Sequence, residues 1–163
     1  MRIRSHTRRT ALTLTAAALA GAGATAVLGG SAEAIPAPQK SCSFTYKTIS
    51  SNQGWQPMGM NVSVDNGTTS RKVVAQLAAD LGVDTLAEVR VGYSIDGGPV
   101  QERVYGPANL ANHDEYWETR STIAVIPLAR GTHTVTPYWR ISGSPGKNGY
   151  FQTGCFTVEG RTR

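Results

Sequence analysis

Between Arg71 and Asp96 the hydrophobic residues alternate with polar ones at a period of two. Successive side chains of a β-strand point to opposite faces, so this pattern predicts two strands that each bury one face. The polar pair Asp84-Thr85 separates them, and together they are predicted to form a long β-hairpin. The apolar odd positions before and after this break are Val73, Ala75, Leu77, Ala79, Leu81, Val83, Ala87, Val89, Val91, Tyr93 and Ile95.

A helix is the alternative for the first half of this segment. Val73, Leu77 and Leu81 also lie near one helical face, and Gly82 could end the helix. The strand interpretation is preferred because the same parity continues beyond the break.

Shorter alternating runs predict strands at 43–48, 60–64, 100–105, 118–128, 132–141 and 150–158, whereas 106–114 is predicted to be a loop. Turn signals such as Asp96-Gly97-Gly98 separate the runs. About eight strands at regular spacing, with at most one short helix, predict an all-β fold. We expect an antiparallel β-sandwich, either jelly-roll or immunoglobulin-like.

The first 34 residues have the pattern of a secretory signal peptide. Four arginines precede an uncharged run at 11–28, and the segment ends in the small residues of Ala32-Glu33-Ala34. We expect cleavage after Ala34, a flexible leader over 35–41 and a single sandwich domain over 42–160. A retained membrane anchor is the alternative, and Arg8-Arg9 leaves open whether export is general or twin-arginine.

Cleavage would change the charge balance. The chain has 16 Lys and Arg and 11 Asp and Glu, of which the first 34 residues contain four and one. The mature chain would then carry 12 basic and 10 acidic side chains, a net charge of about +2. No basic run interleaved with aromatic residues remains, so nucleic-acid binding is not supported. We expect a secreted, extracellular protein with no membrane contact after cleavage.

The chain has two cysteines, Cys42 and Cys155. In an oxidising extracellular compartment they are expected to form one disulfide that joins the first strand to the last. Two free thiols or a redox pair are the alternative, although no Cys-x-x-Cys motif supports the latter.

The densest polar group lies in and after the predicted loop. Carboxylate and amide oxygens there could bind calcium, but their spacing matches no EF-hand, so a solvated loop is preferred and no cofactor is expected. His113 has no second His or Cys at zinc-ligand spacing. The calcium candidates are Asp114, Glu115 and Glu118, flanked by Asn109, Asn112 and His113.

Catalytic motifs are sparse. A glycosidase needs two carboxyl groups across a cleft, and the only nominees are Glu115 and Glu118, which are neighbours in sequence. The chain contains no Gly-x-Ser-x-Gly nucleophile motif. His133 is expected to make a hydrogen bond in the core or at its rim rather than to perform acid–base chemistry. We therefore expect a non-enzyme, with a small hydrolase as the lesser alternative.

Aromatic residues give the more useful indication of binding. Tyr116, Trp117, Tyr138 and Tyr150 lie at strand starts or opposite the apolar face, where flat rings can stack on sugars or contact a protein. For Trp117 and Trp139 the pattern favours packing into the core, and for the two tyrosines in strands both alternatives stay open. The expected function is a non-catalytic binding module for extracellular polysaccharide, cell wall or a secreted protein. Self-assembly into a homo-oligomeric structural protein is the alternative.

Two short motifs carry a resemblance. The run Leu128-x-x-Gly131-x-His133-x-Val135 resembles a loop-to-strand signature of bacterial immunoglobulin-like domains, and 91–97 is similar to an earlier strand and turn of such modules. With Trp139-Arg140 and 155–158, the pattern also resembles small secreted actinomycete proteins of unknown function and jelly-roll modules of phage tail proteins. The resemblance covers about 72–159. It implies a fold and assigns no active-site residue.

Overall fold

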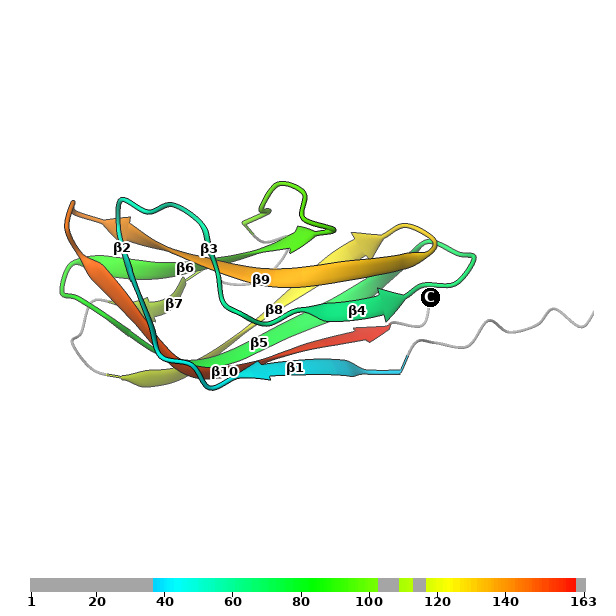
Figure 1. Cartoon of the computed structure of the whole chain (residues 1–163), viewed down its shortest axis with the longest axis horizontal. Helices are drawn as coiled ribbons and strands as arrows, with labels where there is room; N and C mark the ends of the chain where they lie inside the picture. Colours follow the sequence, from blue (N-terminus) through cyan, green and yellow to red (C-terminus); the bar gives the residue numbers. More distant parts are fainter. Residues whose placement is uncertain (1–36, 103–108, 113–116, 161–163) are drawn as a thin grey trace, which may run out of the picture. The chain divides into compact units, whose positions relative to one another are not determined.

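The computed structural model describes residues 37–102, 109–112 and 117–160. Within these ranges ten strands form two antiparallel five-stranded sheets, and no helix is present. All of the strands belong to one compact unit, Glu33–Arg163. Figure 1 shows the sheets as two layers, with β9 and β6 in one and β5 and β10 in the other. The predicted antiparallel β-sandwich is confirmed.

The first sheet has the order β1-β10-β5-β8, and β2 also pairs with β10. The last strand of the chain therefore lies inside this sheet. β1 begins at Gln39, within the segment expected to be a flexible leader. The strands are β1 (Gln39–Ser43), β2 (Lys47–Ser50), β5 (Arg71–Val83), β8 (Glu118–Leu128) and β10 (Asn148–Gly160).

The second sheet has the order β3-β9-β6-β7, and β4 also pairs with β9. β7 lies inside the segment that was predicted to be a loop. The sequence did not indicate this strand, because four residues are too few to give a periodic hydrophobic signal. Of the strand predicted at 100–105, the described part forms a single bridge between Gln101 and Tyr93. The strands are β3 (Gln56–Pro57), β4 (Val62–Asp65), β6 (Ala87–Ile95), β7 (Asn109–Asn112) and β9 (Thr132–Gly143).

The predicted hairpin between β5 and β6 is wrong. β5 pairs with β10 and β8 in the first sheet, and β6 pairs with β9 and β7 in the second. The chain crosses between the sheets at a tight turn, in which the Ala87 amide donates to the Asp84 carbonyl at 3.2 Å and Leu86 has a φ of 64°. The odd side chains of both strands nevertheless point into the core, as predicted. The odd-numbered side chains are buried whether two strands pair in one sheet or face each other across the core. The alternation alone therefore does not identify which strands pair.

The core fills the space between the two sheets. Trp139 on β9 and Phe151 on β10 are both fully buried, and their rings meet edge to face with centroids 6.0 Å apart. The predicted burial of Trp139 is thus confirmed. A register shift between Phe151 and Thr153 indicates a β-bulge in β10. Because the bulge adds one residue, Phe151 and Phe156 both face the core although their numbers differ by five.

The predicted disulfide is confirmed. Cys42 on β1 and Cys155 on β10 are paired directly across the two strands, with their Cα atoms 4.1 Å apart. Their side chains lie on the outer face of the sheet, because the neighbouring Ser43 and Phe156 are buried. The bridge therefore attaches an edge strand to the interior strand β10.

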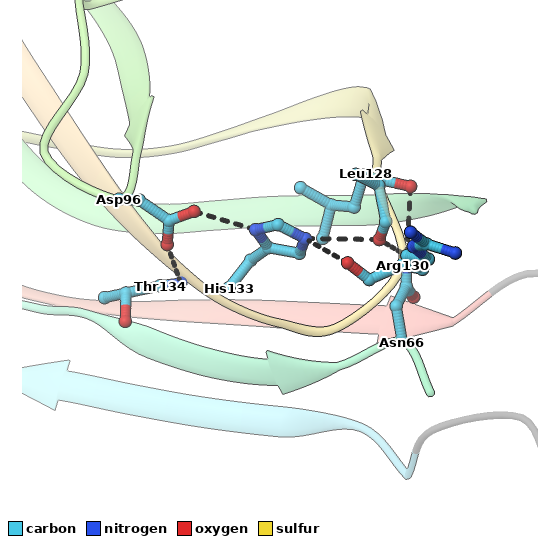
Figure 2. A network of polar contacts seen from close by, with 7 residues as sticks. Asn66, Asp96, Leu128, Arg130, His133 and Thr134 are labelled. Carbon is cyan, nitrogen blue, oxygen red and sulfur yellow. Dashed lines mark hydrogen bonds and ion pairs between the residues drawn. The ribbon is translucent and has the colours of Figure 1, made fainter. Parts of the chain in front are cut away.

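A hydrogen-bonded network closes one end of the second sheet (Figure 2). His133 Nδ1 lies 2.7 Å from Asp96 Oδ2, and His133 Nε2 lies 3.2 Å from the carbonyl oxygens of Ala129 and Arg130. The other Asp96 oxygen accepts a hydrogen bond from the Thr134 amide at 2.7 Å. The network joins β9 to the turn after β6 and to the turn between β8 and β9. The expectation that His133 forms hydrogen bonds at the rim is confirmed.

The turn that carries Asp96 was also predicted correctly. Asp96 and Gly97 have φ values of 52° and 73°, and the Gly98 amide donates to the Ile95 carbonyl at 2.9 Å. Two consecutive positive φ values are typical of the tight turns that glycine and aspartate favour. The hydrogen bond between the two side chains raises the pKa of His133 above 6.5 and lowers the pKa of Asp96 below 3.8.

We predict that loss of the disulfide strongly destabilises the fold. The two cysteines are 113 residues apart, and a loop of that length corresponds to about 4–5 kcal/mol of stabilisation on the chain-entropy model. Urea unfolding of the double variant Cys42→Ala/Cys155→Ala should show a lower free energy of unfolding by an amount of this order. Reductant should destabilise the parent protein and leave the variant unchanged. Equal unfolding midpoints for the parent with and without reductant would contradict the prediction.

We also predict that the His133–Asp96 pair makes stability depend on pH. Its contribution from the raised pKa of His133 is complete below about pH 6.5 and is lost as the pH rises through the folded-state value. The contribution from the lowered pKa of Asp96 is present above pH 3.8 and is lost as the pH falls through the folded-state value. Urea titrations from pH 3 to 9 should show both losses in the parent. Asp96→Asn should remove both losses, whereas His133→Gln should remove the alkaline loss and reduce the acid one, because the Thr134 amide still donates to Asp96. An unchanged pH profile in Asp96→Asn would refute this assignment.

Candidate aromatic binding site

Three aromatic residues from separate segments meet on the outer face of the first sheet. Trp117 contacts Tyr46 with ring centroids 6.0 Å apart, and it contacts Tyr150 with centroids 6.3 Å apart. Tyr46 is 57% exposed and Trp117 is 46% exposed. We call these three residues the aromatic cradle.

The strand register explains why Tyr150 faces outward. Its neighbours Gly149 and Phe151 are buried, so the alternation of β10 places the Tyr150 side chain on the opposite face. Tyr150 is paired with Gly82 of β5 on one side and with Thr48 of β2 on the other. Tyr46 comes just before β2, so it approaches Tyr150 from that edge of β10.

Gly82 forms the floor of the cradle. A Cβ atom added there would lie 3.6 Å from the Trp117 ring and 3.7 Å from the Tyr150 ring. Trp117 immediately precedes β8, whose first residue is paired with Leu81. Since Gly82 has no side chain, the indole can lie over β5 and reach the tyrosine on the next strand.

Asp84 supplies a positioned carboxylate beside the rings. The Tyr150 hydroxyl donates to Asp84 Oδ1 at 3.0 Å, and the backbone amide of Asn148 donates to Asp84 Oδ2 at 2.7 Å. The hydrogen bond to Asp84, with desolvation, raises the pKa of Tyr150 above its ordinary value of 10. Each carboxylate oxygen retains a further lone pair that can accept a hydrogen bond.

These groups surround an open depression of about 260 Å³, lined by Tyr46, Gly82, Val83, Asp84, Trp117 and Tyr150. Flat aromatic faces can stack on the C–H surface of a sugar ring, and a carboxylate can accept hydrogen bonds from its hydroxyl groups. A small number of positioned polar groups beside aromatic surface is the usual composition of a small-molecule site.

The structure brings together two of the four predicted binding residues. Trp117 and Tyr150 belong to the cradle, and the expectation that Trp117 packs into the core is wrong, because it is about half exposed. Tyr138 lies on the outer face of the second sheet, where it is paired with Gly92 and Pro57, and it is not part of the cradle. Tyr116 lies outside the described residues.

Tyr46 was not identified from the sequence, although a signal existed. Its alternation with Phe44 was interpreted as a strand, whereas both side chains are exposed in the connection between β1 and β2. In an antiparallel pair with Cys42 opposite Cys155, residues that follow Cys42 lie beside residues that precede Cys155. Tyr46, four positions after Cys42, is therefore expected beside position 151, four positions before Cys155. The predicted disulfide could therefore have indicated that this tyrosine lies near Tyr150.

The candidate calcium and hydrolase residues are mostly outside the described ranges. His113, Asp114 and Glu115 fall there, so their proposed roles stay predictions. Glu118 is described, and it forms an ion pair with Arg120, whose Nε lies 2.6 Å from a Glu118 oxygen. Among the described residues, no group of three or more His, Cys, Asp or Glu side chains could hold a metal ion.

A charged cluster on the second sheet is a less suitable site. Arg90 on β6 is paired across the strands with Arg140 on β9, and Glu102 lies 2.9 Å from each guanidinium group. Arg140 also lies 4.9 Å from the centre of the Trp55 ring. The hydrogen bond between Glu102 and Arg90 raises the pKa of the arginine and lowers that of the glutamate. Glu88 also lies 3.3 Å from Arg90, so two arginines and two glutamates compensate one another. Ion pairs that stabilise the sheet are a sufficient explanation of this cluster.

His133 is no better suited to acid–base chemistry. Its Nε2 faces two carbonyl oxygens, which can only accept hydrogen bonds, so this nitrogen carries a proton. A general base needs a free lone pair directed at its substrate. The aromatic cradle is therefore the strongest candidate site in the described part of the protein.

In the ranges that the structure describes, no helix has the length and apolar character needed to span a membrane.

Similarity to other proteins does not identify the ligand of this site. The chain matches no protein-family model and no curated protein. The function is therefore inferred from the chemistry of the cradle.

Proposed function

We propose that this protein is a secreted, non-catalytic module that binds extracellular polysaccharide through the aromatic cradle. The observation that carries the proposal is the meeting of three rings from distant segments, two of them over Gly82, beside the carboxylate of Asp84. Two of these rings leave about half of their surface exposed. Clustered exposed apolar surface is a common mark of a binding site.

Export is supported by the predicted signal peptide and by the disulfide. Structural disulfides persist in oxidising compartments and are rare in the cytosol of most organisms. The Cys42–Cys155 bridge joins strands of the sandwich itself, so the folded domain requires such a compartment for its full stability.

A sugar is favoured over a protein partner by the size and chemistry of the cradle. A stable protein contact involves about 20–30 residues on each partner, whereas six residues line the depression of the cradle. Its aromatic faces suit the C–H surface of a sugar ring. Asp84 is already oriented by two hydrogen bonds, so it can accept sugar hydroxyls without reorganising.

Self-assembly is a second candidate, supported by the edge strand β8. This strand has 11 residues, its pairing in the described part of the chain is to β5, and Ile123 on it is 50% exposed. Long edge strands with exposed apolar residues tend to pair with another chain. We predict that any dimer seen by light scattering would dissociate in Ile123→Lys. A strict monomer at high concentration would contradict this second candidate.

We predict that the exported, purified protein is retained on at least one insoluble or gel-embedded polysaccharide. The panel would contain chitin, cellulose, xylan and peptidoglycan. Trp117→Ala and Tyr150→Ala should each weaken the affinity by about tenfold or more, because central aromatic contacts dominate binding energy.

Tyr138→Ala is the matched control, since it removes a tyrosine from the outer face of the other sheet. Its affinity should equal that of the parent. Urea unfolding of each variant would verify that the fold is intact, and Trp117→Phe keeps a ring at the position if the alanine variant is unstable. Failure of the parent to bind any polymer of the panel, or equal binding by parent and cradle variants, would refute the proposal.

A further inference from the structure

We infer that the aromatic cradle accepts a single non-acidic sugar unit of a soluble or amorphous chain, and that it discriminates against uronic acid units and flat crystalline surfaces. This inference rests on the proposed function, because it specifies the ligand of the same site. Two independent observations carry it: the tilt of the rings, and the charges next to them.

The rings do not form a flat platform. Trp117 is tilted by 51° against Tyr46 and by 50° against Tyr150. In a crystalline polysaccharide the exposed sugar faces lie in one plane, and only coplanar rings can stack on several of them together. Rings inclined by this amount instead enclose one sugar ring from more than one side.

The spacing of the rings also indicates one subsite. The centroids are 6.0 and 6.3 Å apart, so neighbouring rings contact each other and leave no room for separate sugar units between them. The depression of about 260 Å³ lies just below the roughly 300–1,000 Å³ of sites for drug-sized ligands. It suits one sugar ring, with the rest of the chain extending away from the sheet.

The charged groups next to the floor on β5 are acidic. Asp84 lines the depression, and Asp80 lies two residues before Gly82 on the same face of β5, where it accepts a hydrogen bond from the Thr119 hydroxyl. Across the sheet, Tyr150 is paired with the uncharged Thr48. A sugar carboxylate in the cradle would therefore be repelled by two aspartates.

Three basic residues lie within three positions of the rings in sequence, Lys47, Arg120 and Lys147, and the first two have partners away from the cradle. Lys47 follows Tyr46, but its Nζ donates to the Pro57 carbonyl at 3.2 Å, on the side facing the other sheet. Arg120 is bound to Glu118. A sugar hydroxyl, unlike a carboxylate, can donate a hydrogen bond to the free lone pairs of Asp84. Geometry and charge thus select the same ligand, a ring with hydroxyl or acetamido groups and no acidic group.

The test compares soluble hexasaccharides of equal length by isothermal titration calorimetry. The neutral probes are cellohexaose and chitohexaose, and the acidic probe is hexagalacturonate. At low salt we expect at least one neutral probe to bind about tenfold or more tightly than the acidic one. The difference in affinity between the neutral and the acidic probes should decrease at high salt, because screening weakens the repulsion between the aspartates and the sugar carboxylates. Amorphous cellulose or chitin should also retain more protein per accessible chain than the crystalline form.

Asp80→Asn separates charge from stacking. The asparagine oxygen can still accept the Thr119 hydroxyl, so the cradle should keep its affinity for the neutral probe while hexagalacturonate binds several-fold more tightly. Asp65→Asn, on β4 of the other sheet, is the matched control and should change neither affinity.

The outcomes distinguish the two levels of the proposal. If the protein binds none of these hexasaccharides and is retained on no polymer of the panel, the proposed function is wrong. Retention on a polymer without binding to cellohexaose or chitohexaose would overturn this inference and leave the proposed function standing. If sugars bind but hexagalacturonate binds as tightly as the neutral probes, or Asp80→Asn leaves the preference unchanged, the assignment by charge is overturned while the function stands. Preferential retention on the crystalline polymer would overturn the single-unit geometry in the same way.

Discussion

The pairing of β10 along both of its edges is the constraint on which the rest of the structure depends. One edge pairs with β1 and β2, and the other pairs with β5 from Gly149 to Gly160, apart from the bulge. This register places Cys155 opposite Cys42, Phe151 in contact with Trp139 in the core, and Tyr150 beside Gly82 on the outer face. The disulfide, the core and the cradle are therefore three consequences of one strand's position.

The bulge in β10 makes these three roles compatible. Strict alternation would place Phe151 and Phe156 on opposite faces, because five residues separate them. The register shift between Phe151 and Thr153 restores both rings to the core, and it leaves Tyr150 and Cys155 together on the outer face. Gly154 permits this packing, because a Cβ atom there would lie 2.9 Å from the Phe151 ring.

The two outer faces of the sandwich carry different clusters, with paired charges on the second sheet and partly exposed aromatic rings on the first. On the second sheet, Arg90 and Arg140 share Glu102, and the guanidinium of Arg140 lies over Trp55. On the first sheet, Asp84 is held by Tyr150 and a backbone amide, but Tyr46 and Trp117 remain about half exposed. Polar groups oriented by the protein, next to aromatic surface left open to water, are the arrangement that a stacking ligand would complete.

The sequence by itself determined the local features of this protein. Alternation from Val73 to Ile95 specified strands and their buried face, Asp96-Gly97-Gly98 specified a turn, and two cysteines indicated one disulfide. These features depend on which side chains avoid water and which backbone angles are accessible, and both are readable within a few residues.

Only the tertiary structure decided which strands pair, where β10 gains its extra residue, and that Tyr46, Trp117 and Tyr150 meet. The supposed hairpin became a crossing between sheets, because burial on one face is the same for either pairing. The cradle joins segments up to 104 residues apart in sequence. Their proximity follows from the register of the first sheet, and a local hydrophobic pattern carries no record of a strand's distant neighbours.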